Sequence, residues 1–186
     1  MKNKHVEIVY EDKDILVCIK PAGMATQSRR FDVPDLESIL RNHVATHGGK
    51  SDYLAVIHRL DQPVQGLLVF AKTPAAARNL NKQLATRGFS KHYQAVLEGI
   101  PSVLDGTLEN HLLHDAKSNL SRACPAGTPG ARLARLHYRV LRTEGERCSV
   151  EITLDTGRHH QIRAQMSSLG CPIVGDVKYG AKPSKP

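Results

Sequence analysis

A single carboxylate between cationic side chains is the clearest chemical feature of the sequence. Asp61 ends the run His58-Arg59-Leu60-Asp61 and is followed by the apolar stretch Gly66–Ala71, which has the composition of a buried strand. Burying an ionised carboxylate is costly unless a partner keeps it charged. Asp61 is therefore either half of a structural ion pair or a group that takes part in a reaction.

Two later segments also place polar residues inside apolar surroundings. Tyr93 follows Lys91 and His92 near the start of a predicted strand, and Arg163 ends the run 157–163, where a strand gives way to a helix. Taken alone, Tyr93 fits a tyrosine that packs in a sheet, and Arg163 fits a surface arginine. The three segments together indicate a site built from distant parts of the chain.

Histidines in these segments raise the question of a metal site. His58, His159 and His160 are available as ligands. Zinc sites usually combine two ligands at close regular spacing, as in H-E-x-x-H or C-x-x-C, and the sequence contains neither. The zinc deaminase signature is absent as well. We therefore expect no metal ion.

Charge and cysteine content indicate the partner and the compartment. The 186 residues include 26 Lys or Arg and 18 Asp or Glu, which gives a net charge of +8. This excess favours a nucleic acid over an acidic membrane surface. No run approaches the roughly 18 apolar residues of a membrane span. The four scattered cysteines predict free thiols in a reducing compartment, the cytoplasm.

Residue patterns predict a mixed architecture of class α+β. The predicted strands are 6–10, 15–19, 56–57, 67–71, 93–98, 134–140 and 149–154. Helices are expected around 36–44, from Thr73-Pro74 through Leu84 to Gly88, and over 160–169, since Thr is a common N-cap and Pro is favoured at the first helical position. We expect a largely antiparallel mixed sheet flanked by helices and loops.

The stretch from Ala116 to Gly130 is rich in Ser, Pro, Gly and Ala, and it predicts a surface loop. From Lys117 to Arg142 there are six Lys or Arg and no acidic residue. Such a stretch is either a solvated strand face or a surface that contacts phosphates, and the overall charge favours the second interpretation.

The polar segments, in this order, resemble the RluA-like family of pseudouridine synthases. Residues 58–61 resemble its H-R-L-D motif, 91–93 its K-x-Y motif, and 157–163 its G-R-x-H-Q-I-R motif, which continues into a tail over 170–180. The start, 14–23, resembles the family's first strand and K-P-x-G turn. The resemblance covers roughly residues 6–180 and implies the family's catalytic fold.

The resemblance also implies roles for individual residues. Asp61 matches the essential aspartate, which attacks the ribose or removes its 2′ proton while uracil leaves and rejoins through carbon 5. Tyr93 matches the tyrosine that stacks on the base and helps to remove the carbon-5 proton, and Arg163 matches the charge partner of the aspartate. Arg59 matches an arginine that fills the space of the flipped nucleotide, and Ile173 an apolar floor of the uracil pocket.

Other motif residues are expected from the resemblance to bind substrate: His58, Arg158 and His160. No cofactor is expected, because the reaction rearranges one substrate without net oxidation or reduction. The sequence departs from the family's pattern in two places. Val64 and Gln65 stand where hydroxyl residues are frequent, and His159 stands where threonine is frequent. These changes bear on local hydrogen bonds and on RNA preference.

The resemblance predicts an RNA pseudouridine synthase that acts on ribosomal or transfer RNA. We expect residues 1–186 to form a single catalytic domain with no N-terminal S4 domain, and a monomer with no obligatory protein partner. Two alternatives stay open. One is a catalytically silent RNA-binding module on the same scaffold, and the other is a uridine-directed nucleosidase that would release free uracil.

Overall fold

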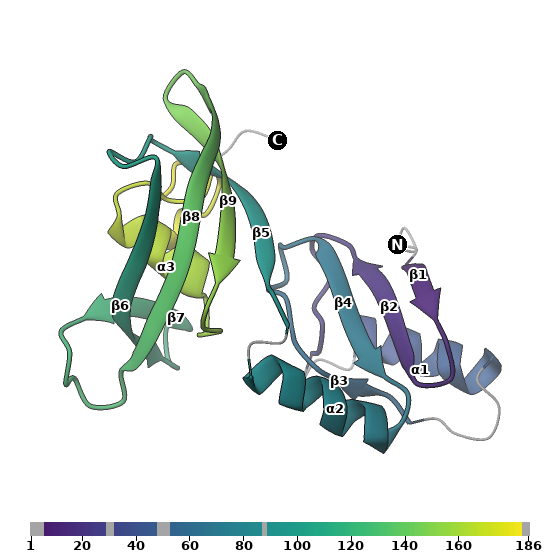
Figure 1. The fold of residues 1–186 in the computed structure, drawn as a ribbon. Helices are drawn as coiled ribbons and strands as arrows, with labels where there is room; N and C mark the ends of the chain where they lie inside the picture. Colours follow the sequence, from purple (N-terminus) through teal and green to yellow (C-terminus); the bar gives the residue numbers. More distant parts are fainter. Residues whose placement is uncertain (1–5, 29–31, 48–52, 87–88, 184–186) are drawn as a thin grey trace. The chain divides into compact units, whose positions relative to one another are not determined.

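The computed structural model describes residues 6–28, 32–47, 53–86 and 89–183 (Figure 1). The chain divides into two compact units, Met1–Phe89 and Ser90–Pro186, called unit 1 and unit 2 below. Each unit has its own sheet and its own buried core.

Unit 1 is built on a four-stranded antiparallel sheet. Its strands are β1 (Glu7–Glu11), β2 (Ile15–Lys20), β3 (Ala55–Val56) and β4 (Gly66–Ala71), in the order β1-β2-β4-β3. Strands β1 and β2 form the hairpin expected from the sequence. Strand β4 pairs with both β2 and β3, so the loop that carries Asp61 connects two neighbouring strands of one sheet.

Two helices cover opposite faces of this sheet. Leu36, Leu40 and Val44 of α1 (Leu36–His47) pack with Leu16 and Cys18 of β2. On the other face, α2 (Pro74–Ala85) packs against β4 through an apolar cluster that includes Ala77, Leu80 and Val69. The predicted N-cap of α2 is confirmed, because the Thr73 hydroxyl accepts the backbone N–H of Ala76 at 3.2 Å.

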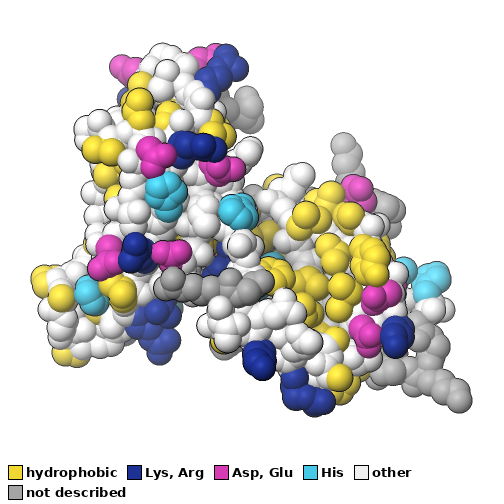
Figure 2. Space-filling model, in the orientation of Figure 1, with side chains coloured by type: hydrophobic (Ala, Val, Ile, Leu, Met, Phe, Trp, Pro, Cys, Tyr) yellow, Lys and Arg dark blue, Asp and Glu magenta, His cyan; other side chains and the backbone are white. Residues whose placement is uncertain are grey.

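Part of the sheet face beside α2 carries exposed apolar side chains. Figure 2 shows hydrophobic side chains gathered over β2 and β4. Leu67 is 58% exposed, while Val17 and Ile19 are half-buried. The register pairs Leu67 with Ile19 and Val69 with Val17, so these four side chains share one face of unit 1.

Unit 2 is built on a five-stranded antiparallel sheet of order β5-β9-β8-β6-β7. Helix α3 (Gln161–Ser168) follows the last strand, and its Met166 lies in the buried core of this sheet. A short 3-10 helix, η1 (Val177–Tyr179), comes next. The strands are β5 (His92–Glu98), β6 (Asp105–Asp115), β7 (Leu120–Cys124), β8 (Arg132–Glu144) and β9 (Arg147–Leu154).

The prediction of a surface loop over Ala116–Gly130 is wrong for the middle of this stretch. Residues 120–124 form strand β7, which pairs with β6 at the edge of the sheet. The prediction also missed β6. The prediction failed because an edge strand needs few apolar residues and can have the composition of a loop. In β7 only Ser121 is buried.

Strand β8 has one apolar and one basic face. Ala134, Leu136 and Tyr138 are buried, while Arg135 and Arg139 point to the exposed face. The basic stretch has no acidic residue of its own, but acids of neighbouring strands and of the loop after β9 lie opposite it. Arg135 contacts Glu109 at 3.7 Å and Asp155 at 3.1 Å, and Arg139 contacts Glu151 at 3.1 Å. Arg135 and Arg139 of β8 therefore take part in ion pairs with neighbouring segments.

The predicted class, α+β with antiparallel sheets, is confirmed. No helix among the described residues is long and apolar enough to cross a membrane. All four cysteines are free thiols, and three of them, Cys18, Cys148 and Cys171, are buried. Burial raises the pKa of the Cys18 thiol to about 11, so this thiol is protonated at neutral pH.

Candidate active site

The loop that carries Asp61 is fixed through its backbone. The buried Thr26 hydroxyl donates to the carbonyl of Leu60 at 3.0 Å, and the N–H of Leu60 approaches the same oxygen at 3.3 Å. On the other side of Asp61, the carbonyl of Gln62 accepts the N–H of Gly23 at 2.8 Å. Asp61 itself is half-buried and its carbonyl accepts the N–H of Val64. Its neighbours on both sides are thus held by the 23–26 segment.

A fully buried lysine holds these two segments together. The ammonium of Lys20 donates to the carbonyls of Met24 at 2.7 Å, Pro21 at 3.1 Å and Gln62 at 3.1 Å. An ammonium has three hydrogens to donate, and these carbonyls are good acceptors for them in the interior. Gly23 has φ 77°, a left-handed conformation that favours glycine, and this turn aims the carbonyls at Lys20.

Sequence reasoning missed the role of Lys20 although the pattern contained a signal. Leu16, Cys18 and Lys20 alternate along β2, and all three are fully buried. A lysine at the next inward position of a buried strand is a sign of a structural or functional partner. The sequence had assigned Lys20 only to the K-P-x-G turn.

His58 fixes the start of the same loop. Its Nε2 accepts the backbone N–H of Val69 at 3.4 Å, and its ring lies 5.3 Å from the ring of Phe89. Because Nε2 accepts, the neutral ring carries its proton on Nδ1. Arg59 is exposed. The structure therefore brings His58, Arg59 and Asp61 together on one loop of unit 1.

In unit 2, Tyr93 and Ile173 meet at one apolar cluster. Tyr93 lies on β5 opposite Ile152, and Ile173 forms an isolated bridge with Leu97 of the same strand. Both are partly buried and pack against the core that contains Leu97 and Ile152. The predicted stacking residue and the predicted pocket floor thus share one hydrophobic surface.

Arg163 lies in a charged network of unit 2. Its Nε and Nη2 donate to the two carboxylate oxygens of Asp176 at 2.6 and 2.7 Å, and both side chains are nearly buried. The guanidinium also lies 4.7 Å from the ring centre of Tyr179. Two parallel bonds of this kind fix the plane of a guanidinium. The predicted pairing of Arg163 with Asp61, a residue of unit 1, stays a prediction.

His160 connects this arginine to Tyr179. Arg163 Nη1 lies 3.1 Å from His160 Nε2, and His160 Nδ1 lies 2.9 Å from the Tyr179 hydroxyl. Since arginine can only donate, His160 Nε2 must accept, which places the ring proton on Nδ1, toward Tyr179. The Tyr179 hydroxyl also accepts the N–H of Ser121 of β7 at 2.8 Å. This network fixes the orientation of the His160 ring.

Three histidine rings lie in contact beside this network, with His159 stacked on His160 and His114 tilted against His159. The ring centres of His159 and His160 are 3.7 Å apart, and those of His114 and His159 are 4.0 Å apart. The Ser121 hydroxyl donates to the carbonyl of His159 at 2.7 Å. The sequence analysis did not single out His114 or Ser121, because both lie on strands it had missed.

Gln161 shapes the loop that carries Arg158. Its carbonyl oxygen accepts the N–H of Arg158 at 3.0 Å and the hydroxyl of Thr156 at 2.8 Å, while its amide donates to the carbonyl of Arg135 at 3.1 Å. Gln161 is 3% exposed, so these bonds replace solvent for its whole side chain. The loop is thereby fixed immediately before α3.

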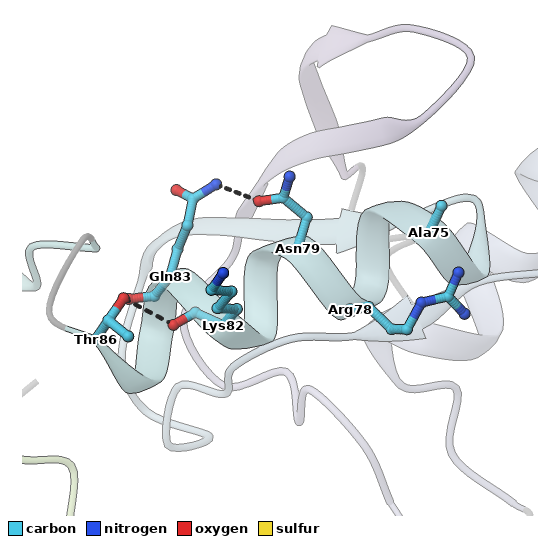
Figure 3. A pocket seen from close by; sticks show the side chains of 6 residues that line it. All are labelled: Ala75, Arg78, Asn79, Lys82, Gln83 and Thr86. Carbon is cyan, nitrogen blue, oxygen red and sulfur yellow. Dashed lines mark hydrogen bonds between the residues drawn. The ribbon is translucent and has the colours of Figure 1, made fainter.

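A shallow hollow elsewhere in unit 1 contains none of the predicted site residues. It runs along α2 and is lined by polar and small side chains, among them Arg78, Asn79, Lys82 and Gln83 (Figure 3). Gln83 donates to Asn79 at 2.7 Å. Within the described residues, no group of three or more His, Cys, Asp or Glu is arranged to hold a metal ion.

A family model described as RNA pseudouridylate synthase matches residues 14–168 of the chain. The chain belongs to the RNA pseudouridylate synthase family. The family predicted from the four motifs is therefore confirmed. The matched region includes Asp61, Tyr93 and Arg163, and their catalytic roles stay predictions.

Individual members of the family cover nearly the whole chain. It is 35% identical over 180 residues to the uncharacterized RNA pseudouridine synthase YhcT of Bacillus subtilis, covering 94% of this chain and 58% of that protein. It is 33% identical over 189 residues to the ribosomal large subunit pseudouridine synthase D of Pseudomonas aeruginosa, covering 95% and 54%. The chain spans about half the length of the curated relatives it matches.

Solved structures of the family share this fold. Human RNA pseudouridylate synthase domain containing 4 is 25% identical to the chain, with a TM-score of 0.80 over 97% of this chain and 73% of that one. Human RNA pseudouridylate synthase domain containing 1 is 26% identical, with a TM-score of 0.74 over 95% and 70%. The pseudouridine synthase fold expected from the sequence is confirmed.

Proposed function

We propose that this protein isomerises uridine in RNA to pseudouridine, with Asp61 as the reactive carboxylate. The observation that carries the proposal is the family match over 14–168, which includes an aspartate on a loop fixed from both sides. A catalytic group gains rate when the fold holds it in position before substrate arrives. The bonds from Lys20 and Thr26 provide such positioning.

The proposed reaction rearranges one substrate. Asp61 attacks the ribose or removes its 2′ proton while the bond from carbon 1′ to the uracil nitrogen breaks. The uracil turns, and its carbon 5 forms a bond to the same ribose carbon as the bond to Asp61 breaks or the 2′ proton returns. The carbon-5 proton then leaves, and the former glycosidic nitrogen takes up a proton. No electron is gained or lost overall, so the proposed mechanism needs no redox cofactor.

Tyr93 and Ile173 support the proposal through their shared apolar surface. A uridine within an RNA stem must leave the base stack before its glycosidic bond can be reached, which costs a few kcal/mol. Stacking of the base on an aromatic ring recovers about 1–3 kcal/mol. In this proposal Tyr93 is that ring and takes part in removing the carbon-5 proton, and Ile173 forms the floor beneath the uracil.

The positive side chains support binding of the polyanion. Arg163 is the proposed charge partner of Asp61, Arg59 fills the space left by the flipped nucleotide, and Arg158, His58 and His160 contact the substrate. Ribosomal RNA is the first candidate substrate, because several relatives at 33–34% identity are named ribosomal large subunit pseudouridine synthase D. Transfer RNA is the second. We expect a monomeric cytoplasmic protein in which the whole chain acts as one catalytic domain.

Replacing Asp61 by asparagine tests the proposal. RNA labelled with tritium at carbon 5 of uridine releases its label when pseudouridine forms. We expect Asp61→Asn to bind RNA as the wild type does and to lower tritium release at least about a hundredfold, the usual contribution of a positioned acid or base. The matched control is Asp105→Asn, an exposed carboxylate of unit 2 that pairs with His137. Its release should equal that of the wild type.

Other outcomes would support the alternatives. Wild-type turnover in Asp61→Asn would remove Asp61 from the mechanism. A wild-type protein that binds RNA and never releases tritium would be a silent RNA-binding module, and free uracil among the products would indicate a nucleosidase. Chemical mapping of pseudouridine in total RNA from cells with and without the protein would identify the substrate.

A further inference from the structure

Two cations meet at one end of the unit 2 sheet. Lys91 stands immediately before β5, and its carbonyl accepts the N–H of Leu154 at 3.0 Å, which continues the ladder between β5 and β9. Arg158 lies four residues after Leu154, in the loop before α3. Both side chains are half-buried, so they lie within the surface of the unit.

The Lys91 ammonium lies close to Gly157, the residue immediately before Arg158. A Cβ added to Gly157 would lie 3.1 Å from the ammonium nitrogen of Lys91, closer than ordinary van der Waals contact. The Lys91 ammonium therefore rests against the backbone immediately before Arg158.

Arg158 is held while most of its donors stay available to a ligand. Its Nε donates to the carbonyl of Leu133 at 2.7 Å, and its backbone N–H donates to Gln161 at 3.0 Å. Within the described part of the chain, no acceptor lies within hydrogen-bonding distance of its two terminal nitrogens. Four of its five donor hydrogens belong to those nitrogens.

Neither cation has a carboxylate within ion-pair distance among the described residues. Other arginines of unit 2, such as Arg135, Arg139 and Arg163, each have one. Burial and then the charge of Arg158 lower the pKa of Lys91. Two like charges that share a half-buried position destabilise each other, and a bound anion would reverse this effect.

We propose that the Lys91 ammonium and the Arg158 guanidinium bind one phosphate of the RNA backbone between them. This inference rests on the proposed function and adds Lys91, which the sequence analysis gave no role. A phosphate accepts several charge-assisted hydrogen bonds at once, which suits a point charge beside a planar fork. Contacts of this kind fix the position of the RNA without reading its sequence.

Lys91 and Arg158 lie close enough to Tyr93 for a bound phosphate to position a nucleotide beside the target base. Lys91 and Tyr93 are two residues apart on a continued ladder, so their side chains lie on the same face, about 7 Å apart along the strand. Tyr93 is the proposed stacking platform for the target base. A phosphate held at Lys91 and Arg158 would therefore orient a nucleotide beside that base.

Salt dependence of RNA binding tests the subsite. The probe is a fluorescein-labelled RNA hairpin with uridines in its loop, and its dissociation constant is measured by anisotropy over a range of KCl concentrations. Each lost phosphate contact lowers the slope of log affinity against log salt by about 0.7–0.9. We expect Lys91→Gln and Arg158→Gln each to lower the slope by one such step. The double variant should lower it no further than one step, because both residues bind the same phosphate.

Arg142→Gln is the matched control. It also removes one positive charge from unit 2, but Arg142 lies near the β8–β9 hairpin, at the other end of the sheet from Lys91, and pairs with Glu144. Its slope should equal that of the wild type, and Lys91→Arg should restore the slope lost in Lys91→Gln. Thermal unfolding of each variant checks the fold, and Arg158→Gln provides an independent result if Lys91→Gln unfolds.

Equal slopes for Lys91→Gln, Arg158→Gln and Arg142→Gln would overturn the subsite, and so would additive losses in the double variant. The proposed function has a separate measurement. If the wild-type protein releases tritium but the slopes of all three variants are equal, the proposed function stands and the phosphate subsite is rejected. If the wild-type protein releases no tritium but Lys91→Gln lowers the slope by one step, the subsite stands and the proposed function is rejected.

Discussion

The two units hold their proposed catalytic residues by different means. In unit 1 the loop around Asp61 is fixed by a buried cation that donates to backbone carbonyls, those of Pro21, Met24 and Gln62. In unit 2, Arg163 is fixed by bonds between side chains, with Asp176 on one side and His160 on the other. The bonds to backbone carbonyls in unit 1 depend on the path of the chain and not on which side chains those residues carry. The bonds between side chains in unit 2 depend on the identity of each partner. Substitutions should therefore have different effects in the two units.

The largest expected effect is that of Lys20→Met. This change keeps the apolar stem but leaves the Met24 carbonyl without its buried donor, while the carbonyls of Pro21 and Gln62 each keep a backbone N–H donor. One unsatisfied buried acceptor costs about 1–3 kcal/mol, and the loss of two further hydrogen bonds to a charged group adds to this cost. We expect the free energy of unfolding to fall by about 3 kcal/mol or more, measured by urea denaturation.

Gln62→Ala is the control for this prediction. The Lys20 ammonium contacts the carbonyl of residue 62, and the side chain of Gln62 adds only one bond of 3.3 Å to the carbonyl of Gly23. We expect a loss below about 1 kcal/mol, the usual net worth of one such hydrogen bond. A loss equal to that of Lys20→Met would contradict the idea that the loop is held through its backbone.

The second effect is that of Asp176→Asn in unit 2. Asparagine keeps one acceptor oxygen and removes both the charge and the second parallel bond to Arg163. A hydrogen bond to a charged group is worth about 1.5–3 kcal/mol, so we expect a loss of about 2 kcal/mol in the free energy of unfolding. Asp115→Asn, which changes an exposed aspartate at the end of β6, should have a much smaller effect. Wild-type stability in Asp176→Asn would show that the identity of the partner does not matter.

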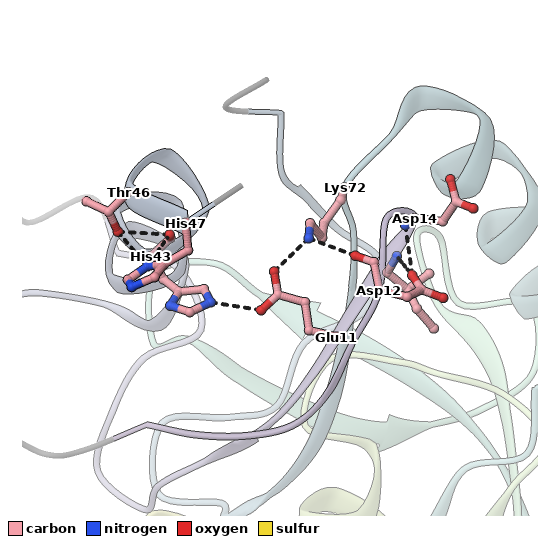
Figure 4. Close-up of polar contacts among 8 residues, drawn as sticks. Glu11, Asp12, Asp14, His43, Thr46, His47 and Lys72 are labelled. Carbon is pink, nitrogen blue, oxygen red and sulfur yellow. Dashed lines mark hydrogen bonds and ion pairs between the residues drawn. The ribbon is translucent and has the colours of Figure 1, made fainter. Parts of the chain in front are cut away.

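The smallest effect concerns a charge network nearer the surface of unit 1. Glu11 accepts from Lys72 at 2.6 Å and lies 2.8 Å from His43 (Figure 4). Burial raises the pKa of Glu11, but the hydrogen bonds and charges of Lys72 and His43 together outweigh it and leave the pKa below its ordinary value of 4.5. A carboxyl with a lowered pKa in the folded state stabilises the fold above its unfolded pKa, and this contribution disappears as the pH falls through the folded pKa.

We therefore expect the stability of the wild type to fall as the pH drops below about 4.5, by less than about 1 kcal/mol from this group. Glu11→Gln should remove that part of the pH dependence and leave the rest unchanged. The measurement is the midpoint of urea denaturation at a series of pH values. An identical pH profile in Glu11→Gln would show that the network contributes nothing.

The sequence predicted the elements whose residues follow a strong pattern. Strand β2, strand β4 and the N-cap of α2 were found because alternation and the Thr-Pro pair are local signals. Strand β7 was missed because the polar residues of an edge strand resemble a loop, and β6 was missed because its many polar residues and its glycine hide the alternation of a strand. The family motifs located Asp61, Tyr93 and Arg163, but no local pattern indicated that Asp176 would bind Arg163.

The sequence alone determined the family, the class of chemistry and the residues of the motifs, because these depend on residue type and order. Only the tertiary structure showed that Lys20 is buried beneath the Asp61 loop, that Arg135 and Arg139 of β8 are paired, and that Lys91 and Arg158 lie together. The physical reason is the same in each case. Partners that neutralise or position a charge come from distant segments, and spacing along one segment says nothing about what the fold places opposite it.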